Sequence, residues 1–314
     1  MNIMVAITDI TAMRIWAHQG LLDEVGSPLS GNGLDWTLES ARELSACGLE
    51  QLGITPSEKD PVHVLVDSPE RRVRSCLAQS HVWSGRVPDG SLYQVAPGIL
   101  VASPAFCCLQ AAAAGSFPFT ACVEMECLGR YGRVGTARGF LDREPLLSAS
   151  ELEGYLLSAL PCRGARKALR ALRCCLGPSR SPLETKTALI LTLPNKFGGY
   201  GLPRPEMNCV VRPRPEEVPI SQFASYEIDI CWLQRRAAVE VDSYQYHSGP
   251  AQHNVDAMKR NSLKSMGWKV TSVTDGQLEG DALDVLARQL AGDLGVRLSG
   301  PTAELRDWLL TQIP

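Results

Sequence analysis

The sequence has no CxxC pair, no excess of positive charge and no long uninterrupted apolar run. The absence of CxxC pairs argues against a structural zinc site, because such sites take closely spaced cysteines and histidines. The 11 cysteines are odd in number and stand mostly among apolar residues. This favours buried thiols in a reducing compartment over a disulfide framework, so we expect a cytoplasmic protein.

Two further absences restrict the class of protein. The formal net charge of −3 gives no overall attraction to phosphate, so any nucleic-acid binding must come from a local basic patch. The first ten residues have neither a basic segment nor a long apolar core, and we do not expect a secretory signal. Residues 90–123 contain no charged side chain, but Pro97, Pro104 and Pro118 interrupt them, so we expect no membrane span.

The chain length of 314 residues allows two domains. Residues 1 to about 55 are predicted to be mainly helical, and strands are expected later in the N-terminal half. Ser148 or Ser150 is a candidate cap for a fresh helix, which sets the expected domain boundary. We therefore predict an N-terminal α+β domain over residues 1–150 and a second domain over residues 151–314.

Residues 226–247, YEIDICWLQRRAAVEVDSYQYH, alternate in side-chain character on both sides of a short polar turn, as a β-hairpin does. If Leu233 pairs with Arg236 across the turn, Asp229 lies opposite Glu240 on the same face. Like charges at such a position destabilise a sheet by roughly 0.2–1 kcal/mol. A bound divalent cation would offset this repulsion. A solvated acidic strand face is the alternative interpretation.

Basic residues recur at helical spacing just after the midpoint of the chain. No acidic residue occurs between Glu153 and Glu184. A surface of this kind can neutralise the phosphates of DNA or RNA, and the alternative is an ordinary solvated helix face. We name this set the basic stripe; it consists of Arg163, Arg166, Lys167, Arg170 and Arg173.

Ser181 and Pro182 predict the start of a helix that carries Glu184 in its first turn. A carboxylate at this place also interacts well with the helix dipole, so a capping or dipole role is one interpretation of Glu184. From this helix onward the predicted order is helix, strand, strand, strand, helix, strand, helix. The order predicts an α/β fold in which helices flank a mixed sheet.

The same region resembles the PD-(D/E)XK nuclease superfamily, and within it the very-short-patch-repair (Vsr-like) endonucleases. The likeness covers roughly residues 160–290. It rests on an acidic residue in the leading helix, an Asp in the second strand, an E-x-D motif in the third, a following His, a D-x-x-(K/R)-R motif and a GW-x-V strand. The matching residues here are Glu184, Asp229, Glu240, Asp242, His247, Asp256, Lys259, Arg260 and the stretch 267–270. The resemblance implies a restriction-endonuclease-like fold.

This resemblance implies a Mg²⁺-dependent endonuclease, with Mn²⁺ as a substitute ion. Asp229, Glu240 and the backbone carbonyl of Val241 would hold the cation, because hard oxygen ligands suit both ions. Glu184 would reach it through water. The cation would help to generate the attacking nucleophile and stabilise the charge of the transition state.

The lysine that usually follows in the third strand of the superfamily is replaced by Asp242. The resemblance implies that Asp242 holds a second ion or orients the nucleophile, and that His247 acts in acid–base chemistry or contacts the scissile phosphate. His247 or Lys259 could take over part of the role of the missing lysine. Lys259 and Arg260 are also expected to contact nucleic acid.

Residues 62–72 and 98–110 resemble, more loosely, abortive-infection proteins of type IV toxin–antitoxin systems, which often precede such nuclease domains. This likeness implies DNA as the favoured substrate, a role in phage defence or DNA repair, and a toxin–antitoxin partner protein. Two other interpretations stay open. One is an antitoxin-like, DNA-binding regulator that has lost most of its cleavage activity, and the other is a structural α/β protein with an acidic face.

Overall fold

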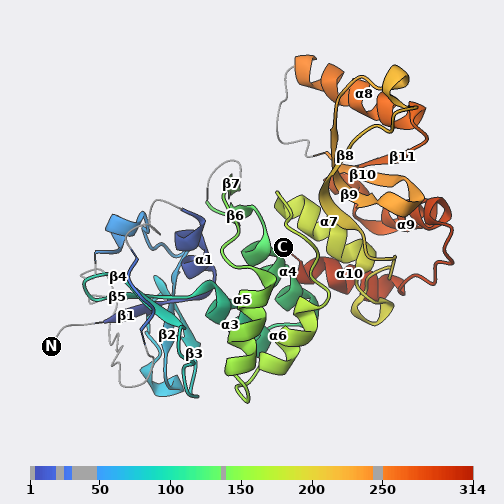
Figure 1. The fold of residues 1–314 in the computed structure, drawn as a ribbon. Coiled ribbons are helices and arrows are strands. Elements are labelled where there is room, and N and C mark those ends of the chain that lie inside the picture. The colour runs from blue at the N-terminus through green and yellow to red at the C-terminus, as the bar shows by residue number, and fades with distance from the viewer. Residues whose placement is uncertain (1–3, 19–24, 30–47, 136–138, 243–249, 314) are drawn as a thin grey trace. The chain divides into compact units, whose positions relative to one another are not determined.

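The computed structural model describes residues 4–18, 25–29, 48–135, 139–242 and 250–313 (Figure 1). The chain forms two compact units, which are described separately. Unit 1 consists of residues 1–127 and 131–173, and unit 2 of residues 128–130 and 174–314.

Unit 1 is built on a five-stranded mixed sheet with the order β3-β2-β1-β5-β4. The short first strand pairs in parallel with β5 and antiparallel with β2, so it lies at the centre of the sheet. The prediction of helix over the first 55 residues was therefore wrong for this strand. The strands are β1 (Val5–Ile7), β2 (Val62–Val66), β3 (Ala78–Val82), β4 (Leu92–Ala96) and β5 (Ile99–Ala102).

The described residues of unit 1 also form five α-helices and a two-stranded ribbon. Among the helices, α3, α5 and α6 pack against one another (Figure 1). The Ser103 hydroxyl caps α3 by accepting the backbone N–H of Phe106. The elements are α1 (Asp9–Ala17), α3 (Pro104–Ala114), α4 (Phe117–Leu128), α5 (Ala149–Ser158), α6 (Ala165–Leu172), β6 (Tyr131–Arg133) and β7 (Phe140–Asp142).

The boundary between the units lies near residue 173 rather than near 150. Ser148 does cap a new helix, since it forms a capping box with Glu151. However, Leu152 and Leu156 of that helix are fully buried in the core of unit 1. A helix start is visible in the sequence, but the sequence does not show that this helix packs against α3 and α6.

Unit 2 contains a four-stranded sheet with the order β11-β10-β9-β8. β8, β9 and β10 run antiparallel in succession, and β11 lies parallel to β10. The predicted order of elements and the mixed α/β class are confirmed here. The elements are α7 (Pro182–Thr192), β8 (Glu206–Val211), β9 (Tyr226–Trp232), β10 (Ala237–Val241), α8 (Pro250–Ser265), β11 (Lys269–Val273), α9 (Gly280–Leu294) and α10 (Ala303–Gln312).

Helix α8 is tied to β9 through the hydroxyl of Tyr226. This buried phenol exchanges a short hydrogen bond with Ser262 of α8, and it accepts the backbone N–H groups of Gln222 and Phe223 at 3.1 and 3.2 Å. The apolar side of α8 contributes Leu263 to the core below it. These contacts fix the part of α8 that carries Lys259.

No helix in the described part of the chain is long and apolar enough to cross a membrane. The cysteines within the same residues all carry free thiols.

Candidate functional site

The β9–β10 hairpin has the register that the sequence predicts. Val239 pairs with Ile230, so the next pair along the ladder places Asp229 opposite Glu240. The turn is closed by a 3.2 Å hydrogen bond from the Arg236 N–H to the Leu233 carbonyl. Arg236 has a φ of 49°, which supplies the left-handed residue that a hairpin turn needs without an Asn-Gly pair.

Glu240 is the most constrained carboxylate of this hairpin. Its side chain is 10% exposed, and its Oε2 accepts a 2.6 Å hydrogen bond from Nζ of Lys259. The other oxygen, Oε1, is buried and has no hydrogen-bond partner among the described residues. Burial, and secondly the charge of Asp229, raise the pKa of Glu240 to about 7, although Lys259 opposes the shift.

Asp229 is turned toward β10. Its Oδ2 accepts the backbone N–H of Val241 at 2.7 Å. Burial raises the pKa of Asp229, while this hydrogen bond and the charge of Lys259 act in the opposite direction. Asp229 and Glu240 therefore lie in one electrostatic environment that disfavours two negative charges.

Glu184 joins this group from α7. Its carboxylate accepts the Arg180 N–H at 2.9 Å, the Asn208 side-chain amide at 2.8 Å and the Ser181 hydroxyl at 3.1 Å. Glu184 thus has the capping role that its sequence position suggested. Burial, and secondly the charge of Asp229, raise the pKa of Glu184. The same side chain therefore caps a helix and interacts electrostatically with Asp229.

Other predicted residues of unit 2 lie further from this group or outside the described structure. Asp242 is half-exposed and lies 3.7 Å from Arg260 in a weak ion pair. His247 lies outside the described residues. We name Glu184, Asp229, Glu240 and Lys259 the acidic cluster. The acidic cluster does not bring three carboxylate oxygens within 4.8 Å of one another. Among the described residues, the one group of potential metal ligands that meets this criterion lies in unit 1.

The basic stripe belongs to unit 1, not to the unit that holds the acidic cluster. On α6 the buried side is made of alanines, which leaves the charged side chains on the outer side. Two members have partners inside unit 1: Lys167 donates to the Gly115 carbonyl at 2.8 Å, and the Arg170 guanidinium lies 5.9 Å from the centre of the Phe117 ring. Nucleic-acid binding by the stripe stays a prediction.

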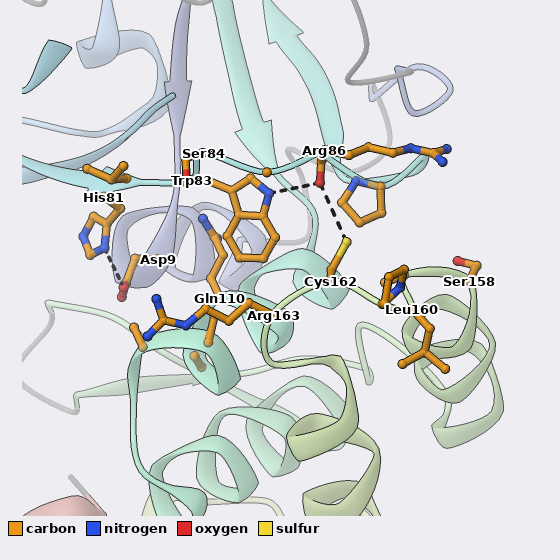
Figure 2. Close-up of a pocket in the computed structure, with 18 of the residues that line it drawn as sticks. Asp9, His81, Trp83, Ser84, Arg86, Gln110, Ser158, Leu160, Cys162 and Arg163 are labelled. Carbon is orange, nitrogen blue, oxygen red and sulfur yellow. Dashed lines mark hydrogen bonds and ion pairs between the residues drawn. The ribbon is translucent and has the colours of Figure 1, made fainter. Parts of the chain in front are cut away.

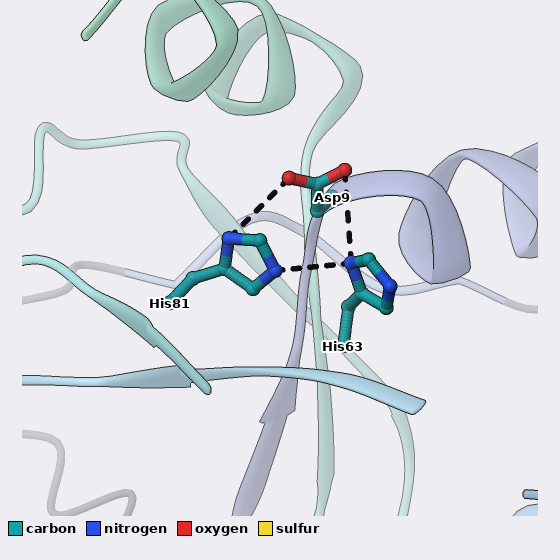
Figure 3. A group of neighbouring side chains, drawn as sticks. All are labelled: Asp9, His63 and His81. Atoms are coloured by element: carbon teal, nitrogen blue, oxygen red, sulfur yellow. Dashed lines mark hydrogen bonds and ion pairs between the residues drawn. The ribbon is translucent and has the colours of Figure 1, made fainter. Parts of the chain in front are cut away.

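A second cluster of ionisable side chains lies in unit 1, and the sequence analysis missed it. Asp9, His63 and His81 bring three potential ligand atoms within 4.8 Å of one another (Figure 3). His63 Nδ1 is 3.0 Å from His81 Nε2 and 3.8 Å from Asp9 Oδ1, and His81 Nδ1 is 3.4 Å from Asp9 Oδ2. We name these residues the His–Asp cluster.

The fold of unit 1 builds this cluster from three separate segments. In the parallel β2–β3 ladder His81 pairs with Leu65, which places it diagonally from His63 on the same face. The Thr8 N–H donates to the His63 carbonyl at 2.9 Å, and Asp9 follows directly as the first residue of α1. A visible signal was available: the chain has five histidines, and two of them stand inside strand patterns.

The His–Asp cluster borders a cavity of about 900 Å³. Asp9 and His81 line this cavity together with Arg72, Gln110 and Arg163. Figure 2 shows the Arg163 side chain extending across the cavity in the direction of Asp9. The cavity therefore combines the cluster with two guanidinium groups.

Comparisons with known proteins identify no activity. No family model matches the chain, and no solved structure matches it. Two proteins of Mycobacterium tuberculosis, described as "Uncharacterized protein MT2308" (strain CDC 1551 / Oshkosh) and "Uncharacterized protein Rv2248" (strain ATCC 25618 / H37Rv), are each 25% identical to it over 124 residues. The similarity spans 40% of this chain and 41% of the length of each relative.

Proposed function

We propose that the chain is a metal-dependent endonuclease that hydrolyses phosphodiester bonds in nucleic acid, with DNA as the favoured substrate. The observation that supports this most is the acidic cluster: Glu184 of α7 and Glu240 of β10 both interact electrostatically with Asp229 of β9, and Lys259 of α8 donates to Glu240 at 2.6 Å. This arrangement matches the restriction-endonuclease-like resemblance in both element order and residue type. We propose that fold for unit 2 on the same ground.

The donor set of the cluster fits a hard divalent cation. Its carboxylates provide oxygen ligands, which Mg²⁺ and Mn²⁺ prefer. The buried Oε1 of Glu240 lacks a partner among the described residues, and the pKa of Glu240 lies at about 7 in the ion-free protein. A nearby cation would give this oxygen a partner and lower the pKa of Glu240. Because Mg²⁺ keeps several of its water ligands, it needs only one or two direct carboxylates.

The protein's own side chains divide the remaining work. Asp229 and Glu240 would hold the cation, with the Val241 carbonyl as the third protein ligand, and Glu184 would bind through water. The bound cation supplies an activated water and neutralises developing negative charge. Lys259 donates to Glu240, so it would take over the role of the missing third-strand lysine and orient the attacking water or stabilise charge on the phosphate.

Asp229→Asn tests this proposal, because it keeps the size of the side chain and removes one charge from the cation site. Cleavage of plasmid and single-stranded substrates in Mg²⁺ or Mn²⁺ should fall at least about 100-fold, while nucleic-acid binding should persist. Asp293→Asn is the matched control, since Asp293 pairs with Lys269 at 3.7 Å and is not part of the cluster. Cleavage by this control should equal that of the unmodified protein.

Two outcomes would contradict the proposal in different ways. If the folded, unmodified protein binds nucleic acid but never cuts it in either metal, the regulator interpretation replaces the enzyme. If Asp229→Asn cuts as fast as the unmodified protein, cleavage does not depend on the acidic cluster.

A further inference from the structure

The His–Asp cluster of unit 1 has no role in the proposed nuclease reaction. Its three residues come from α1, β2 and β3, so the fold rather than a local motif brings them together. Two imidazoles and one carboxylate form a donor set that first-row transition ions prefer, whereas Mg²⁺ favours oxygen ligands. The acidic cluster of unit 2 contains no such nitrogen donors.

The distances within the cluster are compatible with one shared ion. Zinc–nitrogen and zinc–oxygen bonds are about 2.0–2.2 Å long, so ligand atoms around one ion lie about 3–3.6 Å apart. Here one potential ligand atom from each residue lies within 4.8 Å of the other two. His81 directs one nitrogen at His63 and the other at Asp9 (Figure 3), and because one ion binds only one of these nitrogens, binding requires a change in the orientation of this ring and a closer approach of the ligands.

The fold also holds the backbone of one proposed ligand in place. The His63 N–H donates to the Thr11 hydroxyl at 3.0 Å, which ties the backbone at this ligand to α1.

We propose that Asp9, His63 and His81 bind one transition-metal ion of the zinc type, and that an open coordination position of this ion faces the adjoining cavity. Three protein ligands leave at least one position for water or another ligand. Asp9 and His81 line the cavity of about 900 Å³, so a ligand can approach the ion from there.

The chemistry of the cavity assigns a class of ligand to this position. Arg72 and Arg163 line it, and among the described residues neither guanidinium group has an ion-pair or hydrogen-bond partner, although the backbone N–H of Arg72 donates to the Pro69 carbonyl. Guanidinium groups bind phosphate and carboxylate through paired N–H donors. The ligand is therefore a small anion that carries a phosphate or carboxylate group, with one oxygen on the metal and the others near the two arginines.

The test measures Zn²⁺ and Co²⁺ binding to the full chain after treatment with EDTA. The protein carries Asp229→Asn, so that the acidic cluster does not contribute. We expect one ion per chain by calorimetry and a Co²⁺ absorption spectrum typical of nitrogen ligands. His63→Ala, His81→Ala and Asp9→Asn should each weaken binding by about 100-fold or more. His18→Ala and Asp89→Asn are matched controls outside the cluster and should bind as the parent does.

NMR spectra of the parent protein give a readout that does not depend on whether the variants fold. In the parent, Zn²⁺ should shift the imidazole nitrogen resonances of two of the five histidines in NMR spectra. Absence of stoichiometric binding, or binding that persists in the folded His63→Ala and His81→Ala variants, would overturn the metal site and leave a hydrogen-bonded His–His–Asp chain. Neither result depends on nuclease activity.

Inorganic phosphate tests the ligand class. Added to the Co²⁺-loaded protein, it should change the Co²⁺ spectrum, and Arg72→Ala or Arg163→Ala should weaken this effect about tenfold, as the loss of a charge-assisted contact does. Arg71→Ala is the matched control, because Arg71 pairs with Asp67 at 3.1 Å and does not line the cavity. A spectrum that phosphate leaves unchanged would overturn the anion assignment.

Discussion

Unit 2 places several carboxylates around one lysine, whereas unit 1 places two imidazoles around one carboxylate. The first cluster has an excess of negative charge in a buried environment, and the pKa values of all three acids are raised as a result. In the second cluster burial lowers the pKa of both histidines, so its bases are neutral. On the two proposals above, the first site binds a hard cation and the second an ion that prefers nitrogen. The comparison indicates that the type of ion a site prefers depends on which side chains are buried there.

Among the variants that test this comparison, we expect Lys259→Met to have the largest effect on cleavage. This change removes the only cation within hydrogen-bonding distance of Glu240 among the described residues. We expect the pKa of Glu240 to rise further above 7 and cleavage to fall about 100-fold, because charge on the phosphate loses its partner. Lys264→Met, on the same helix, is the control. NMR titration of Glu240 and a cleavage assay provide the two readouts.

The pH dependence of stability should have opposite signs for the two clusters. The folded-state pKa of Glu240 is about 7, above the ordinary value of 4.5, so between these pH values the folded state holds a proton that the unfolded state releases. This stabilising contribution is present below pH 4.5 and is lost as the pH rises through 7, by roughly 3 kcal/mol. Glu240→Gln should abolish the loss, as urea unfolding in EDTA at several pH values would show.

His63 and His81 should produce the reverse trend. Their folded-state pKa values lie below 6.5, so the unfolded state binds more protons, and their contribution to stability increases as the pH rises toward and through 6.5. His81→Gln should flatten this increase. If stability changes in the same direction with pH for both clusters, the contrast between them is wrong.

The basic stripe offers a smaller effect that separates binding from cleavage. Replacing Arg166, Arg170 and Arg173 with alanine should weaken nucleic-acid binding about tenfold and reduce the slope of its salt dependence by up to about 2.7, since three fewer phosphates are neutralised. Binding measured at several salt concentrations provides the check. An unchanged affinity at every concentration would identify the stripe as a solvated face.

Helix caps provide the smallest effect, and they test the division into units. Ser148 caps α5 in unit 1, and Thr302 caps α10 in unit 2. Alanine at either position should cost about 1 kcal/mol. Hydrogen exchange should show that Ser148→Ala destabilises unit 1 and Thr302→Ala unit 2. If Ser148→Ala destabilised unit 2 instead, the boundary near residue 150 would be restored.

The success of sequence reasoning depended on how local each feature is. The hairpin register followed from alternation along β9 and β10 and from the length of one turn, so Asp229 and Glu240 were placed correctly. β1 was missed because a strand of three residues is too short to show a period. The His–Asp cluster was missed because its residues belong to three segments whose proximity only the sheet order creates.

The Tyr226 hydroxyl also affects the acidic cluster, although Tyr226 and Lys259 lie far apart in the sequence. Ser262, which it binds, stands three residues after Lys259, so less than one turn of α8 separates the tie to β9 from the ammonium that reaches Glu240. Loosening α8 at Ser262 would move Lys259 away and raise the pKa of Glu240. The protonation state of this carboxylate therefore reports whether α8 is seated on the sheet, and a spectroscopic signal from Glu240 would follow the docking of that helix.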